Sequence, residues 1–216
     1  SQYGVLTPAF ARPREGGGYE LVSGHRRLLA CQVLPLETLP VVVRGMTDDE
    51  AVISMVDANL SREYILPSEQ AFADKMKLDA IKHQGKTSPQ VAEKLSAEQV
   101  GNAEGISKDQ VWRYIRLTNL TPELLQMVDD RKIAFNPAVE ISYLTVDEQK
   151  TLLTEMQAQD CTPSHAQSIR LKKLSQEGTL SPEELNKILS EEKPNQVQHY
   201  KFKSEDIRKY FPKNYT

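Results

Sequence analysis

The pattern of apolar and polar positions divides the chain into a short first part with strand-like runs and a long second part with helical spacing. In the first 46 residues, β-type runs occur at residues 8–12, 19–22 and 41–44. Three glycines at residues 16–18 separate the first two runs and predict a hairpin turn. Residues 24–34 carry apolar side chains at helical spacing. This order of runs predicts a small α/β unit.

From Thr47 onward, nearly every segment carries the start signals of a helix. The capping-box pattern, in which Ser or Thr is followed three residues later by Glu or Gln, begins at Thr47, Ser107, Thr145 and Ser181. Proline needs no N–H partner at the first helical position, and it stands there at Pro67, Pro122 and Pro182. Within residues 68–83 we expect one stripe to face the core, formed by Phe72, Met76 and Ala80.

Composition limits the classes of protein to consider. The chain has 39% apolar and 26% charged residues, as in ordinary globular proteins. The net charge of −3 means that nucleic-acid binding has to come from a local patch. The longest aliphatic run, residues 39–43, is too short to span a bilayer. Cys31 and Cys161 lie far apart in no motif, so we expect neither a disulfide scaffold nor a cysteine-rich metal site, and a cytoplasmic location.

Residues 97–117 have the pattern of a helix-turn-helix. Gly101 provides the small residue, Gly105 follows at the turn, and Val111 follows as a buried β-branched residue. Val111, Tyr114 and Ile115 are expected to face the core. Because recognition helices reach base edges in the major groove, the remaining side chains are candidates for DNA contact: Ser107, Lys108, Asp109, Gln110, Trp112, Arg113 and Arg116. The alternative is a pair of ordinary packed helices, with Gln110 used in capping.

Residues 24–27, Gly-His-Arg-Arg, follow a strand and open a helix. Free N–H groups at a helix start and two guanidinium groups together favour an anion, usually phosphate. The alternative is a tight turn with solvated arginines. Asn59 and Arg62 would similarly hold a phosphate or a sugar hydroxyl, or else form an ordinary helix end and surface pair. Residues 4–8 form either a backbone cradle for an anion or the entry to a strand.

Other sequence signals are missing or too weak to use. The chain contains neither the phosphate-loop pattern nor the Gly-x-Gly-x-x-Gly fingerprint of dinucleotide sites. Its four histidines are scattered and predict no metal site.

Taken in order, the segments resemble the ParB family of partition proteins. The matching segments are the Gly-x-Leu-x-Pro-type loop at 4–8, the strand and turn at 19–27, the strand at 40–44, the Asn-Leu-x-Arg-Glu segment at 59–63, the helix start at 67–71 and the Arg-Leu-x-x-Leu segment at 116–120. Each motif is weak alone, and their joint order over residues 4–153 is specific.

The resemblance implies an α+β fold in three parts. A small ParB/sulfiredoxin-like nucleotide-binding domain would occupy residues 1–64, and a helical DNA-binding domain residues 65–160. After about residue 160 the chain matches the family poorly, and its own residues predict a helical C-terminal region at 161–216 with a polar linker at 191–198. Because the family has a further strand and helix before the first loop, the resemblance implies an N-terminally incomplete domain.

The resemblance also implies a function, that of a bacterial, nucleoid- or plasmid-associated protein that binds a specific site on double-stranded DNA. Cytidine triphosphate (CTP) with Mg²⁺ would close a homodimer into a clamp around DNA, and a partition ATPase is an expected partner. A plasmid or a mobile element is the expected source. The implied pocket residues are Gly4, Thr7, Pro8, Gly24, His25, Arg26, Arg27, Asn59, Arg62 and Glu63, with Asn59 on the metal side.

Two departures from the family pattern bear on hydrolysis. Ala58 stands where the family has a magnesium-binding Glu, and Ser61 stands where it has Gln. Asp57 would replace that Glu only if the helix end shifted, so the chain is at most a slow CTPase.

Three alternative functions can be weighed against the sequence. One is a DNA-binding adaptor or transcriptional regulator of a mobile element without nucleotide hydrolysis. A sulfiredoxin-like enzyme would need a cysteine where His25 stands. A nuclease would need clustered carboxylates for a metal, and the sequence offers only Asp57 and Glu63 nearby.

Overall fold

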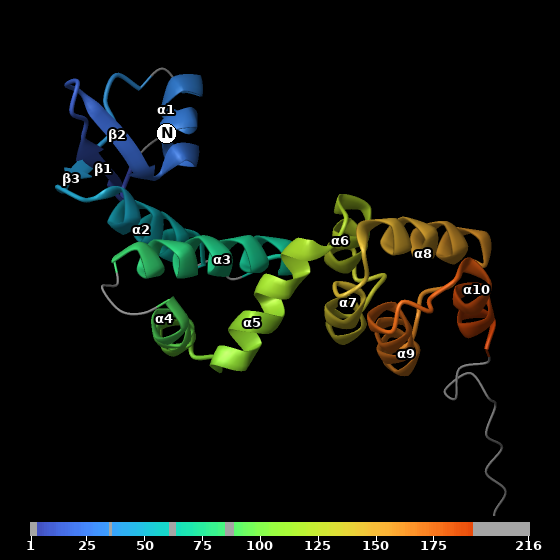
Figure 1. Ribbon diagram of the computed structural model, residues 1–216. Coiled ribbons are helices and arrows are strands. Elements are labelled where there is room, and N and C mark those ends of the chain that lie inside the picture. Colours follow the sequence, from blue (N-terminus) through green and yellow to red (C-terminus); the bar gives the residue numbers. More distant parts are fainter. Residues whose placement is uncertain (1–3, 35, 61–63, 85–88, 192–216) are drawn as a thin grey trace, which may run out of the picture.

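The computed structural model describes residues 4–34, 36–60, 64–84 and 89–191, with side chains described except at 84 and 89–95. Arg62, Glu63 and nearly all of the expected linker at 191–198 lie outside these residues. Figure 1 shows a small sheet and one helix at one end of the molecule, followed by a long helical part. Among the described residues, no helix is both long enough and apolar enough to cross a membrane.

The small α/β unit that the sequence predicted is present at the start of the chain. It consists of β1 (Ala9–Pro13), β2 (Tyr19–Ser23), α1 (His25–Val33) and β3 (Val41–Val43). The strand order is β2-β1-β3, with β1 antiparallel to β2 and parallel to β3. Gly17 and Gly18 have φ angles of 86° and 80°, which favour glycine, so the predicted hairpin turn is confirmed.

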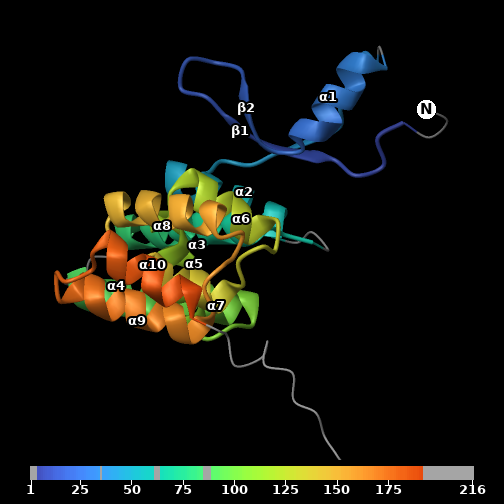
Figure 2. The ribbon, with the colours of Figure 1, turned by 90° about the vertical axis from the view of Figure 1, so that its right-hand side faces the viewer.

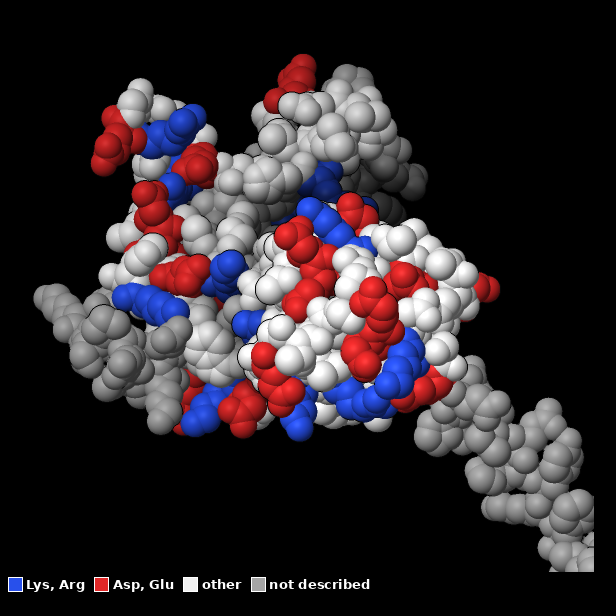
Figure 3. Space-filling view, turned by 45° about the vertical axis from the view of Figure 1, so that its right-hand side comes forward, with Lys and Arg blue, Asp and Glu red and all other residues white. Residues whose placement is uncertain are grey.

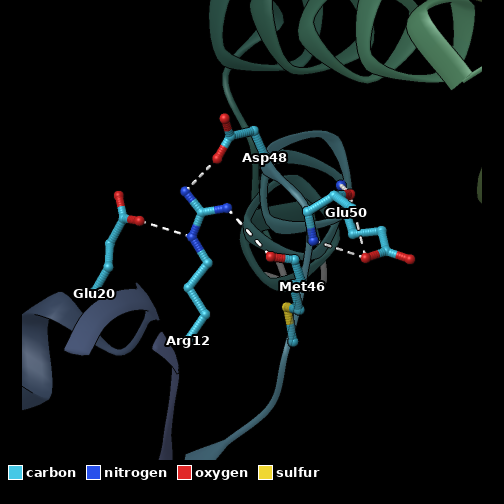
Figure 4. A network of polar contacts seen from close by, with 6 residues as sticks. Arg12, Glu20, Met46, Asp48 and Glu50 are labelled. Carbon is cyan, nitrogen blue, oxygen red and sulfur yellow. Dashed lines mark hydrogen bonds and ion pairs between the residues drawn. The ribbon is translucent and has the colours of Figure 1, made fainter. Parts of the chain in front are cut away.

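Arg12 of β1 connects this sheet to the first helix of the second part, α2 (Asp48–Leu60). Its Nε donates to Glu20 on β2 at 2.7 Å, and its Nη2 lies 2.6 Å from Asp48 of α2. Its Nη1 donates to the carbonyl of Met46 at 3.5 Å (Figure 4). One guanidinium group thus joins two strands to the start of α2.

The second part is helical, as predicted. After α2 come α3 (Pro67–Gln84), α4 (Pro89–Glu104), α5 (Lys108–Arg116), the 3₁₀ turn η1 (Leu117–Asn119), α6 (Pro122–Asp129), α7 (Phe135–Ile141), α8 (Val146–Ala158), α9 (His165–Gln176) and α10 (Pro182–Ser190). Figure 2 shows the sheet and α1 standing clear of these helices, on the side of α2.

The predicted helix starts are confirmed. The three prolines are the first residues of α3, α6 and α10. At Thr47 and Thr145 the hydroxyl accepts the N–H three residues later, and the glutamate there accepts the cap's N–H. Ser164 and Gln167 form a further capping box before α9, which the same Ser-x-x-Gln pattern could have predicted.

The main hydrophobic core lies in the second half of the helical part. It joins Ala71 of α3 to side chains from η1 and α6 through α10, among them Leu117, Leu124, Ile141, Leu152, Leu171, Leu185 and Ile188. This core runs across residue 160, where the sequence analysis placed a domain boundary. We therefore propose that residues 65–190 fold as one helical unit.

The predicted core stripe of α3 is wrong at two of its three positions. Phe72 is 48% exposed and Met76 42% exposed, whereas Ala80 is buried. The face of α3 that packs inward carries Asp74 and Lys77, both almost fully buried. These polar residues have partners on neighbouring helices, and this cannot be read from the spacing of apolar residues.

Gln149 of α8 fixes the connection between η1 and α6. It is 1% exposed. Its Oε1 accepts the N–H of Thr121 at 2.8 Å, and its Nε2 donates to the carbonyls of Asn119 and Leu144 at 3.0 Å. Three main-chain groups therefore depend on one side-chain amide.

We predict that Gln149→Leu lowers the free energy of unfolding by about 2–4 kcal/mol, because buried polar groups left without partners cost roughly 1–3 kcal/mol each. Urea denaturation followed by circular dichroism measures the change. Lys150→Ala, on the exposed side of the same helix, is the control and should shift stability by less than about 0.5 kcal/mol. Equal stability of the two variants would contradict this account of Gln149.

Candidate nucleic-acid interface

Helices α4 and α5 form the predicted helix-turn-helix. The N–H of Ile106 donates to the carbonyl of Gly101 at 2.9 Å. A Cβ placed on Gly101 would lie 2.6 Å from the carbonyl oxygen of Ile106. Gly105 has a φ of 71°, and Val111 is completely buried. All three residues that the sequence pattern singled out therefore do what the turn requires of them.

The first turn of α5 is the exposed end of the candidate recognition helix. Ser107 caps α5 by accepting the N–H of Gln110 at 3.2 Å. Ser107, Lys108 and Asp109 are exposed, and Gln110 is half-buried. Trp112 is half-buried as well, with the ammonium group of Lys82 5.9 Å from its ring centre. The side chains free to approach a groove are thus concentrated at the start of α5.

The two arginines of α5 are held by other helices. Arg113 donates to the amide oxygen of Asn136, at the start of α7. The Nη2 of Arg116 donates to the carbonyl of Ser142 at 2.8 Å, and its guanidinium carbon lies 3.8 Å from the ring centre of Tyr143. Arg116 is therefore half-buried and its guanidinium group is engaged by these contacts. Its partners lie 26 residues or more along the chain, so local spacing could not reveal them.

A polar cluster around the buried side chains of Asp74 and Lys77 lies behind the helix-turn-helix and was not expected from the sequence. The Nζ of Lys77 lies 2.6 Å from Asp57 of α2 and 3.4 Å from Glu104 of α4. The amide of Gln70 donates to Asp74 at 2.6 Å and to Glu104 at 2.8 Å. Five polar side chains thus join α2, α3 and α4. The one signal for this cluster in the sequence is that Asp74 and Lys77, three residues apart, lie on one face of the same helix.

The protonation of Asp74 follows from this environment. Asp74 is fully buried, and burial is the largest cause that raises its pKa, to about 8, followed by the nearby charge of Glu104. Asp57 is paired with Lys77. One oxygen of its carboxylate is directed to Lys77 of α3, although its side chain remains 53% exposed.

The turn before α1 brings four of the predicted phosphate-site residues together. Gly24 caps α1 with a φ of 103°. A Cβ on Gly24 would lie 2.7 Å from that of Ala9, so only glycine fits here. The Nη1 of Arg27 donates to the carbonyls of Thr7 and Pro8. In this structure Arg27 therefore secures the loop before β1, and its charge is not directed to solvent.

The start of α1 retains the features of an anion site. No described side chain caps its first N–H groups, and His25 and Arg26 beside them are exposed. These donors fit a phosphate group. Gly4 and Asn59 are also exposed, Asn59 near the end of α2. Among the described residues, no group of three His, Cys, Asp or Glu side chains is gathered that could hold a metal ion.

Comparisons with known proteins show which proteins this chain is similar to. Residues 1–60 match the ParB N-terminal domain family. The chromosome-partitioning protein Spo0J of Thermus thermophilus is 30% identical over 167 residues, which cover 77% of this chain and 57% of that protein. A probable chromosome 1-partitioning protein ParB of Deinococcus radiodurans is 36% identical over 135 residues, 62% of this chain and 42% of its own length. The chain thus spans about half the length of these relatives.

Among solved structures, the C-terminally truncated ParB of Caulobacter crescentus, complexed to the centromeric parS site, aligns with 85% of this chain. The alignment covers 82% of that chain at 22% identity, with a TM-score of 0.47.

We predict that Gly101→Ala destabilises the helix-turn-helix by about 2 kcal/mol or more, because the added methyl group would overlap a backbone carbonyl that has no room to move. Thermal unfolding measures the loss. The fluorescence of Trp112, the single tryptophan of the chain, reports whether α5 is displaced. Asn102→Ala, at the next and exposed position of α4, should leave both readings unchanged. Unaltered stability of Gly101→Ala would show that the two helices do not pack this closely.

Proposed function

We propose a function from the premise that this chain is a homologue of the ParB and Spo0J chromosome-partitioning proteins and carries a ParB N-terminal domain in residues 1–60. It is a DNA-binding partition or segregation protein that recognises a site on double-stranded DNA through α4 and α5. The observation that carries this proposal is the exposed first turn of α5 on a tightly packed glycine turn.

The geometry of α5 supports major-groove binding. Recognition helices present their first residues to base edges while the preceding helix crosses the backbone. Lys108 is exposed for a phosphate or a guanine, and Gln110 remains half-exposed beside it. On the face shown in Figure 3, acidic and basic side chains are interspersed. The net charge of −3 favours a local DNA contact over binding by a generally basic surface.

Nucleotide binding is the second part of the proposal. The uncapped start of α1 and the exposed guanidinium group of Arg26 would hold the phosphates of CTP, as the family resemblance implies. Arg27 would keep the loop at Thr7 and Pro8 in place beside them. Nucleotide binding would then close a homodimer around DNA. A partition ATPase as partner and a cytoplasmic, nucleoid- or plasmid-associated location belong to the same proposal.

A second candidate is a DNA-binding adaptor or regulator of a mobile element that does not hydrolyse nucleotide. The engagement of Asp57 with Lys77 favours it. With Ala58 next in sequence, the end of α2 offers Asn59 as its metal-side donor. We therefore propose CTP binding without assigning a catalytic residue.

We predict that Lys108→Ala weakens DNA binding about threefold to tenfold. It should also reduce the slope of log affinity against log salt concentration by about one, as expected for one lost phosphate contact. Fluorescence anisotropy with a duplex enriched from a random pool measures both quantities. Lys150→Ala, an exposed lysine of α8, is the matched control and should bind as the unmodified chain does. Equal affinity and equal salt slope in both variants would exclude α5 as the contact.

We predict that the chain binds CTP in preference to the other three ribonucleoside triphosphates, and that Arg26→Ala weakens this binding at least about tenfold because a charged hydrogen bond to phosphate is lost. Calorimetric titration with magnesium present tests this. Arg14→Ala, on the exposed hairpin, is the control. If none of the four nucleotides binds while DNA binding persists, the adaptor is the correct function.

A further inference from the structure

Two carboxyl groups meet at the junction of α3 and α4, where a single lysine charge is already shared. Asp74 is fully buried and the side chain of Glu104 is 12% exposed. Lys77 lies closer to Asp57, at 2.6 Å, than to Glu104, at 3.4 Å. The positive charge of Lys77 therefore mainly balances the carboxylate of Asp57 on α2. This leaves the Asp74–Glu104 pair with more negative charge than its partners neutralise.

The hydrogen bonds of the pair are complete only when it carries a proton. Gln70 donates to Oδ1 of Asp74 and to Glu104. The buried Oδ2 of Asp74 has no described hydrogen-bond partner. A proton on this oxygen would supply the missing bond, with Glu104 as acceptor. Without it, two buried carboxylates would face each other in a region of low dielectric constant, where like charges repel strongly.

We propose that the Asp74–Glu104 pair is a proton-dependent latch that holds the helix-turn-helix in its DNA-binding position. With one proton shared, α4 is closed against α3, and loss of the proton loosens α4 and lowers the affinity for DNA. This inference concerns the regulation of the proposed DNA-binding site and rests on that function.

The position of Glu104 explains how a change in the protonation of the pair would affect the helix-turn-helix. Glu104 is the last residue of α4 and directly precedes Gly105, the turn that leads to Ser107 and α5. A cavity of about 470 Å³ lies beside it, lined also by Asp57, Gln70 and Lys77. This space gives water access to the cluster and gives the Glu104 side chain room to move away from Asp74.

Each helix packed at this junction places a charged or titratable side chain near the Asp74–Glu104 pair. Among the described residues that line this junction, α2 presents Asp57, α3 presents Lys77, α4 presents Glu104 and α5 presents Tyr114. Asp57 and Lys77 form an ion pair. The raised pKa of Asp74, about 8, whose main cause is burial, places the loss of its proton just above neutral pH.

The test compares the whole chain with Asp74→Asn, which keeps the shape of the side chain and cannot ionise. We expect the affinity of the unmodified chain for the enriched duplex to fall about fivefold or more between pH 7 and pH 9, within the usual range of coupling between sites. Asp74→Asn should lack this loss. Asp79→Asn, an exposed aspartate on the same helix, should behave as the unmodified chain does.

A second measurement needs no DNA. Trp112 lies on α5 beside Lys82 of α3, so its fluorescence follows the position of α5 relative to α3. We expect a transition in this signal with a midpoint near pH 8 in the unmodified chain and in Asp79→Asn, and no transition in Asp74→Asn. If Asp74→Asn does not fold, Glu104→Gln replaces it, because it removes the same repulsion.

The outcomes separate the two proposals. A fluorescence transition at the same pH in Asp74→Asn and in the unmodified chain would overturn the latch, whether or not DNA binds. Failure to bind DNA at every pH would overturn the proposed function, and the fluorescence transition would still decide whether the carboxyl pair moves α5. Parallel pH profiles of DNA affinity in Asp74→Asn and Asp79→Asn would likewise overturn the latch.

Discussion

Charge buried on one face of α3 is the constraint on which the helical part of this protein depends. Helix α3 contacts α2, α4, α5 and α6, and at its centre Asp74 and Lys77 occupy positions that would ordinarily be apolar. A buried ion that loses its partner is strongly destabilising. The neighbouring helices must therefore supply Asp57 and Glu104 in the right places. This requirement fixes how α2 and the helix-turn-helix sit on α3.

The sequence could predict those parts of the fold that depend on neighbours in the chain. Glycines at the β1–β2 turn and at Gly101 and Gly105, and the Ser and Thr caps, act over a few residues, and all of them are found. The stripe of α3 was mispredicted, and the contacts of Arg116 could not be foreseen, because long-range partners decide both. An apolar-spacing argument assigns Phe72 and Met76 to the core, since it cannot know that Lys77 finds ionic partners inside and that Asp74 finds a hydrogen bond from Gln70.

The candidate sites show the same division. Gly24 was identified by its place before a helix, and its backbone conformation agrees. That Arg27 binds the carbonyls of residues 7 and 8, whereas Arg26 faces solvent, depends on how the loop before β1 folds back. The side chain of Asp57 presents a similar case. Its place beside Asn59 made it a candidate for metal binding, and its contact with Lys77 places it in the framework that supports α4.

The attachment of the sheet through Arg12 has a mechanical consequence. The apolar core joins Ala71 of α3 to η1 and to α6 through α10, and this shared packing holds these elements together as one body. Beside the packing of β2 on α2, Arg12 links the sheet to Asp48 of α2, whose side chain is 91% exposed. Ion pairs exposed to water contribute roughly 0–1 kcal/mol, which is comparable to thermal energy. Breaking the Arg12–Asp48 ion pair therefore costs little beside disrupting the apolar core, so a force applied to the sheet would part these two side chains before it deformed the packed helices.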